Sequence, residues 1–120
     1  MVRKGSFVLV AAALALALPL AASPATATLK ATVGPGATIT LKNASGRKVT
    51  SLSAGTYTIV VDDRSSEHNF RLAGPAVNKS TGIAFTGKKT WRNVRLAKGK
   101  TYTYLCDPHA DHMRGSVRAR

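Results

Sequence analysis

Cysteine and acidic residues are both scarce in this chain. Its 120 residues include one cysteine, five Asp or Glu residues and 18 Lys or Arg residues, which gives a formal net charge of +13. A single cysteine excludes an intramolecular disulfide and any zinc or iron–sulfur site built from four cysteines. The length fits one domain with one hydrophobic core. Apolar residues are spread through residues 28–120, so this part is not a disordered basic tail.

The sequence also lacks an apolar run long enough to cross a membrane. Its longest such run, residues 7–22, has 16 residues and contains Pro19, whereas a spanning helix needs about 20. Two basic residues precede the run, and the small residues 25–27 follow it. This order is typical of a secretory signal peptide. We therefore predict a signal peptide over residues 1–27, cleaved after Ala27, with a retained membrane anchor as the alternative.

The predicted export changes how the net charge is interpreted. Removing residues 1–27 leaves 93 residues, 28–120, with a net charge of +11. An exported protein does not meet genomic DNA or cellular RNA, so we expect no nucleic-acid partner. A basic protein outside the cytoplasm attracts anionic envelope polymers, lipid headgroups or an acidic protein surface instead. We expect a monomer in the periplasm, in the cell envelope or secreted.

Residues 28–120 alternate between apolar and polar side chains, as β-strands do, and show no helical periodicity. Turn-forming residues recur about every ten positions. The predicted strands are residues 37–42, 55–62, 68–72, 82–86, 91–96, 101–106 and 114–120. Seven or eight short strands in one small domain predict an all-β fold, an antiparallel β-sandwich or barrel.

The scarcest side chains gather in one short loop. Cys106, His109, His112 and Met113 lie within eight residues, and His68 opens a predicted strand 38 residues before the cysteine. Thiolate, imidazole and thioether are the soft donors that select copper, with a long axial methionine beside a plane of two histidines and a cysteine. Taken singly, each residue is more often an ordinary core or surface residue. Zinc accepts one cysteine and two histidines too, but the affinity order and the thioether favour copper.

Three motifs resemble those of the cupredoxins, the small blue copper proteins such as plastocyanin, pseudoazurin and amicyanin. His68-Asn69 resembles the first histidine ligand and the asparagine that ties two ligand loops together. Gly99–Cys106 resembles the strand that carries the cysteine, and Cys106–His109 resembles the Cys-x-Pro-His motif. The resemblance implies a Greek-key β-sandwich with one type 1 copper ion per chain. The ligands it implies are His68, Cys106 and His109 in the plane and Met113 on the axis.

The ligand loop departs from the family pattern in two ways. The spacing from the second histidine to Met113 lies between those common among relatives, which leaves His112 as an alternative fourth ligand. Charged residues, namely Asp107, Asp111 and Arg114, stand where electron-carrying relatives present an apolar patch. The two aspartates could instead accept hydrogen bonds that orient the neighbouring histidines.

The resemblance implies a one-electron carrier that cycles between Cu(I) and Cu(II) and is not an enzyme, because it makes and breaks no covalent bonds. His109 would be the electron port near the surface, and an acidic docking surface is expected on the redox partner. The alternative is extracytoplasmic copper binding for buffering, delivery or sensing. A metal-free basic adhesion domain is a third hypothesis.

Overall fold

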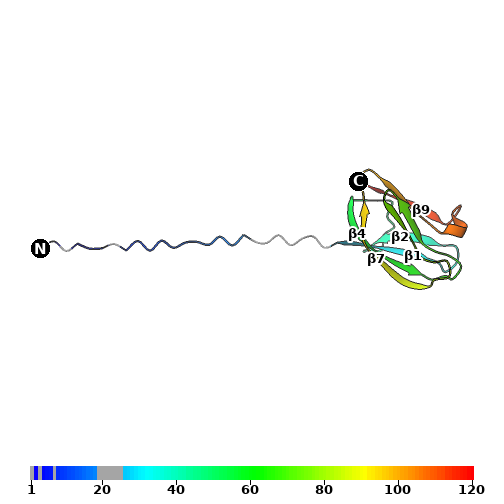
Figure 1. Ribbon diagram of the computed structural model, residues 1–120, viewed down its shortest axis with the longest axis horizontal. Coiled ribbons are helices and arrows are strands. Elements are labelled where there is room, and N and C mark those ends of the chain that lie inside the picture. Colours follow the sequence, from blue (N-terminus) through cyan, green and yellow to red (C-terminus); the bar gives the residue numbers. More distant parts are fainter. Residues whose placement is uncertain (1, 3, 7, 19–25) are drawn as a thin grey trace.

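The computed structural model describes residues 2, 4–6, 8–18 and 26–120. Residues 8–18 form no helix or strand and lead into the folded domain as an exposed segment (Figure 1). Within the described ranges, no helix is long and apolar enough to span a membrane. The rest of the predicted signal peptide, including residues 19–25, lies outside the described residues, so its cleavage stays a prediction.

Two β-sheets pack face to face and form a sandwich from residue 27 onward (Figure 1). The first sheet has the order β2-β1-β4-β7, with bounds Ile39–Asn43, Ala27–Val33, Gly55–Asp63 and Gly87–Leu96. The second sheet has the order β3-β9-β8-β5-β6, with bounds Ser51–Leu52, Arg114–Ala119, Thr101–Leu105, Arg71–Gly74 and Val77–Ser80. A single 3-10 turn, η1 (Asp107–His109), is the only helical element of the described chain. The predicted all-β sandwich is confirmed.

The core follows from the alternation of side chains across each strand. In β4, Tyr57, Ile59 and Val61 are buried, and the residues between them face outward. All buried apolar residues of the described chain lie between Leu29 and Ala119. Residues 26–120 therefore contain the whole described core, and we expect this stretch to fold by itself.

Two of the strand pairs are parallel, so both sheets of the sandwich are mixed. β1 runs parallel to β4, with Ala27 opposite Tyr57, and the short β3 runs parallel to β9. The other pairs are antiparallel. Local alternation reports which face of a strand is buried, but it does not report which distant segment pairs with that strand. β1, β3 and β6 were not among the predicted strands; β3 and β6, with two and four residues, are too short to show alternation.

Two predicted strands are partly or wholly loops in the structure. Residues 82–86 make a turn in which the Phe85 N–H donates to the Gly82 carbonyl at 3.1 Å. Residues 68–70 precede β5 and pair with no strand. Their backbone N–H groups bond instead to the Cys106 sulfur and the Thr81 hydroxyl. An alternating sequence therefore predicts a strand even where the backbone N–H groups bond to side chains and not to a neighbouring strand.

Two glycines leave room for the tyrosines of β8, the strand that leads to Cys106. Tyr102 and Tyr104 are fully buried. A Cβ atom on Gly74 would collide with the Tyr102 ring, and one on Gly115 would collide with the Tyr104 ring. Tyr104 lies directly opposite Gly115 in the β8–β9 register. Packing of the tyrosines on these glycines therefore sets how closely β8 approaches its neighbours.

Gly115→Ala should lower the free energy of unfolding by about 1–3 kcal/mol, because the added methyl group overpacks the Tyr104 ring. Ser116→Ala is the matched control, since Ser116 is the next residue of β9 and is exposed. The control should change stability by less than about 0.5 kcal/mol. Urea denaturation of both variants checks this, and equal stability of the two would contradict the packing argument.

Candidate metal centre

Three predicted ligands from two distant segments meet at one end of the sandwich. His68 lies in the loop after β4, Cys106 directly follows β8, and His109 is the last residue of η1. The two Nδ1 atoms of the histidines are 3.0 Å apart. The cysteine Sγ lies 3.6 Å from each of them. Both imidazole rings thus direct their Nδ1 atoms toward the Cys106 sulfur.

The separations between these donor atoms fit a single metal ion. Nitrogen and sulfur ligands bind a metal ion at about 2.0–2.3 Å, so two ligands of one ion lie at most about 4 to 4.5 Å apart. All three donor atoms lie within 4.8 Å of one another, and the individual separations given above are shorter. A thiolate with two imidazoles is a donor set that suits copper. His68 and Cys106 are buried, and His109 is partly exposed.

Backbone hydrogen bonds close the loop that carries Cys106 and His109. The Cys106 N–H donates to the Met113 carbonyl at 3.0 Å, and the Met113 N–H donates to the His109 carbonyl at 2.8 Å. The His109 N–H in turn donates to the Cys106 carbonyl at 3.1 Å. Pro108 lies in the first turn of η1, where a residue without an N–H group leaves no donor unpaired. These bonds hold both ligands on one compact turn.

Met113 and His112, the two candidates for a fourth ligand, lie in different environments. The Met113 side chain is buried in the core. The His112 side chain is 55% exposed, and its Nδ1 lies 2.8 Å from the Asp111 carboxylate. The His112 ring is also 5.5 Å from the His109 ring, measured between centroids. Asp111 thus contacts His112, in agreement with the suggestion that an aspartate orients a neighbouring histidine. The role of Met113 as the axial ligand stays a prediction.

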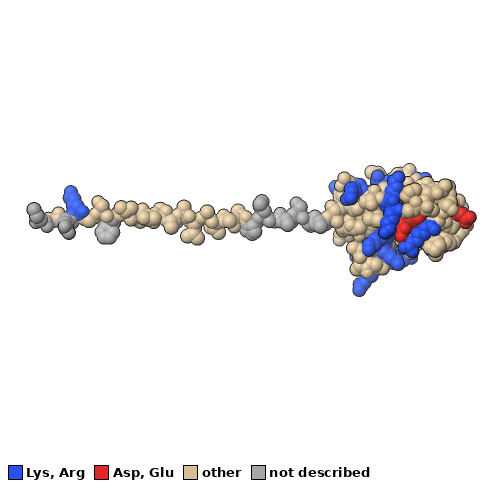
Figure 2. All heavy atoms as spheres, turned by 90° about the horizontal axis from the view of Figure 1, so that it is seen from below, with Lys and Arg blue, Asp and Glu red and all other residues tan. Residues whose placement is uncertain are grey.

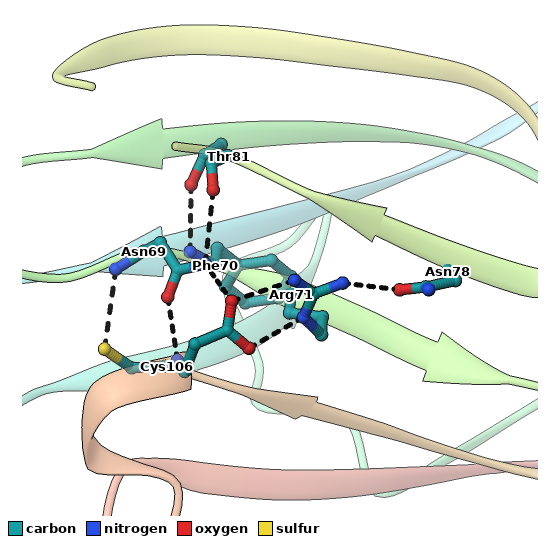
Figure 3. Close-up of polar contacts among 7 residues, drawn as sticks. Asn69, Phe70, Arg71, Asn78, Thr81 and Cys106 are labelled. Atoms are coloured by element: carbon teal, nitrogen blue, oxygen red, sulfur yellow. Dashed lines mark hydrogen bonds and ion pairs between the residues drawn. The ribbon is translucent and has the colours of Figure 1, made fainter. Parts of the chain in front are cut away.

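Asn69 ties the two ligand segments together (Figure 3). Its backbone N–H donates to the Cys106 sulfur at 3.4 Å. Its side-chain oxygen accepts from the Asp107 N–H at 2.8 Å, and its amide nitrogen donates to the Thr81 carbonyl at 3.2 Å. This is the linking role that the resemblance implies for the asparagine.

Asp107 is one of the two aspartates that the sequence suggested could orient a neighbouring histidine. Its carboxylate instead pairs with Arg71 and Asn69. The Arg71 Nε and Nη2 donate to its two oxygens at 2.7 and 2.9 Å, and Asn69 Nδ2 donates at 2.7 Å. A further Arg71 nitrogen donates to the Asn78 side chain at 2.6 Å. The Arg71 guanidinium holds the pKa of Asp107 below its ordinary value, so this group is a carboxylate near neutral pH.

A second group of hydrogen bonds, centred on the buried Thr81, supports the segment that follows His68. The Thr81 hydroxyl donates to Asp63 at 3.0 Å and accepts from the Phe70 N–H at 2.9 Å. The other Asp63 oxygen accepts from the Ser65 N–H at 3.1 Å, and burial raises the pKa of this carboxyl. Sequence reasoning missed Arg71, Asp63 and Thr81, because the Asp63–Thr81 and Arg71–Asp107 pairs join residues 18 and 36 positions apart and form no local motif.

Arg71→Gln should lower the free energy of unfolding by about 0.5–1 kcal/mol. The loss is modest because the ion pair is about one-third exposed and therefore partly screened by water. Arg118→Gln is the control, since Arg118 is exposed on β9 and forms no ion pair with any described residue. A double-mutant cycle with Asp107→Asn isolates the coupling energy, and a value of zero would contradict a structural role for this pair.

Comparison with known protein families agrees with the donor set. Residues 25–120 match the family model described as copper binding proteins, plastocyanin/azurin family. A search of curated proteins finds no match. The family match spans both sheets and the loop that carries Cys106 and His109. The cupredoxin resemblance is thereby confirmed, and with it copper as the cofactor that His68, Cys106 and His109 are positioned to hold. The chain belongs to the plastocyanin/azurin family of copper-binding proteins.

Proposed function

We propose that this protein is a one-electron carrier. A bound copper ion supplies the one-electron chemistry, and the chain supplies ligands that need not move. The observation that carries the proposal is the contrast within the ligand set: His68 and Cys106 are buried, and Asn69 bonds to the Cys106 sulfur, while His109 is partly exposed. No part of the proposal requires a covalent bond in a substrate to be made or broken.

Rigidity of the ligand set supports electron transfer. Asn69 bonds to the Cys106 sulfur and to the backbone of Asp107, and the loop bonds described above join Cys106, His109 and Met113. Cys106 and His109 are therefore held by contacts with the chain as well as by any metal, and His68 directly precedes the residue that makes two of these contacts. Ligands that keep one arrangement in both oxidation states reduce the reorganisation that accompanies electron transfer, because the surrounding dipoles are already in place.

His109 is the proposed electron port. Its Nδ1 faces the other two donors, and its ring is partly exposed, so the imidazole lies between the metal position and solvent. We further propose an extracytoplasmic location, which the basic start and apolar run of residues 1–27 support. Cleavage after Ala27 would leave β1 six of its seven residues.

An acidic docking surface on the redox partner remains part of the proposal. The net charge of +11 on residues 28–120 would attract such a partner from a distance. Asp107 and Asp111 lie beside the electron port, however, and Arg71 is already paired with the first of them. We therefore expect the overall charge to raise the encounter rate, while close docking depends on the uncharged edge of the His109 ring.

Copper handling without electron transfer is the second candidate function. Its support is the exposed His112, whose ring lies 5.5 Å from that of His109 and whose Nδ1 contacts Asp111. An exposed imidazole and carboxylate at the mouth of a buried site could receive copper from, or pass it to, another protein. Because this pair has no role in the electron-carrier proposal, removing it separates the two functions.

Electron self-exchange and copper transfer distinguish these functions. A carrier should show fast self-exchange in mixtures of oxidised and reduced protein, and the rate should rise with salt because two copies of net charge +11 repel each other. His112→Ala should leave that rate unchanged, and copper should pass only slowly to a chelator. NMR line broadening measures the first quantity and stopped-flow absorbance the second. Slow exchange, with copper released readily in a manner that depends on His112, would favour the handling function.

Met113→Leu should leave copper bound and change the reduction potential, because an axial thioether tunes the potential without being needed for binding. His112→Ala is the matched control in the same loop and should leave the potential unchanged. Cyclic voltammetry of both variants tests the assignment. A shift in the His112 variant with none in the Met113 variant would assign the fourth position to His112.

A further inference from the structure

Charge is distributed unevenly along the length of the sandwich. All five acidic residues lie toward the end that holds the three metal-binding residues: Asp62 and Asp63 end β4, Glu67 precedes His68, and Asp107 and Asp111 belong to the ligand loop. Two of the bases nearby are neutralised, since Arg64 pairs with Asp62 and Arg71 pairs with Asp107. Lys88 and Lys89 of β7, opposite Asp62 and Val61, and Arg114 at the start of β9 bring the bases at this end to five, so the five acids of the copper end are balanced by five bases.

The opposite end carries bases and no acids. We define the basic end as seven exposed residues, namely Arg47, Lys48, Arg95, Lys98, Lys100, Arg118 and Arg120. Their segments are joined by backbone hydrogen bonds: Arg118 N–H to Thr50, Arg120 N–H to Leu52 and Gly99 N–H to Ala119, at 2.8 to 3.0 Å. None of the seven forms an ion pair with any residue of the described chain.

The N-terminal segment joins the sandwich at this same end. β1 begins at Ala27, opposite Tyr57 near the start of β4, and Arg95 lies opposite Thr56. Residues 8–18, which are largely apolar and exposed, therefore lead away from the basic end (Figure 1). In Figure 2, Lys and Arg side chains extend from this junction to the middle of the domain, where one acidic patch lies among them, and a second acidic patch lies at the far tip.

We propose that the basic end binds the surface of an anionic phospholipid bilayer, with the copper end directed away from it. Clusters of four to eight bases beside an apolar segment are typical of such surfaces. Within residues 26–120, the one large apolar side chain that is well exposed is Ile83, in the loop between β6 and β7. Binding is therefore electrostatic, at the level of the headgroups, and leaves His109 open to a redox partner.

A membrane fits these observations better than a soluble polyanion does. The seven bases come from the β2–β3 and β7–β8 loops, from the ends of β7 and β9 and from Arg120, so they are distributed over several segments, as contact with an extended surface requires. The N-terminal segment precedes β1 at that end, so the segment, if it is retained, holds the basic end toward the bilayer. The proposal depends on the fold and the charges and not on the electron-carrier function.

Vesicle sedimentation with residues 26–120 tests the proposal without the apolar segment. The test variant carries Lys98→Gln, Lys100→Gln, Arg118→Gln and Arg120→Gln. The matched control loses four exposed bases elsewhere, through Lys30→Gln, Lys79→Gln, Lys88→Gln and Arg92→Gln. Each base near an anionic surface contributes about fivefold to binding, so the test variant, which lacks four bases, should bind vesicles containing phosphatidylglycerol about 600-fold less tightly. The control should lose about tenfold or less, through net charge alone.

Several results would overturn the proposal. These are equal losses in the two variants, equal binding to pure phosphatidylcholine vesicles, or binding of long-chain polyphosphate with no binding to the anionic vesicles. The last result would assign the basic end to a soluble polyanion. Denaturation curves of both variants confirm that each is folded. Metal-free and copper-loaded protein should bind the vesicles equally, so a failure of the copper proposal leaves this result interpretable.

Discussion

The hydrogen bonds of Asn69 are the interaction on which the metal centre depends. One residue donates its backbone N–H to the Cys106 sulfur, accepts the Asp107 N–H on its side-chain oxygen and donates its amide to the Thr81 carbonyl. These contacts join a loop after β4 to a loop after β8, across 37 to 38 residues of sequence. The β5–β8 ladder brings the two segments side by side only from Arg71 and Leu105 onward, so these bonds extend the connection to His68 and Cys106, which lie beyond the end of the ladder. Arg71 adds a hydrogen bond to Asp107 at the same junction, and the Thr81 hydroxyl accepts one from the Phe70 N–H.

The sequence was sufficient for the parts that depend on local pattern or rare chemistry. Alternation in 55–62 and 101–106 predicted β4 and β8, and the scarcity of Cys and His drew attention to residues that do meet in space. It was insufficient where a contact is distant and made of common residues. Residues 82–86 alternate in sequence but pair with no strand of the described chain. The parallel β1–β4 pair joins segments 30 residues apart. The arginine that pairs with Asp107 is 36 residues away in the sequence.

The same sandwich separates two kinds of surface. The copper end combines five acids with paired bases, and the opposite end holds seven unpaired bases where the N-terminal segment enters. Antiparallel strands produce this separation, because the loops at the two ends come from alternate connections of the chain. An electron carrier with this arrangement can bind an anionic surface through its basic end. The electron port at the opposite end then stays uncovered.

The absorption spectrum during titration with Cu(II) tests the central claim most directly, which is that His68, Cys106 and His109 hold copper together. The account predicts an intense blue or green band from thiolate-to-copper charge transfer that saturates at one copper ion per chain. The band should be absent from the Cys106→Ser variant. A colourless copper complex, or a band that persists in Cys106→Ser, would contradict the account.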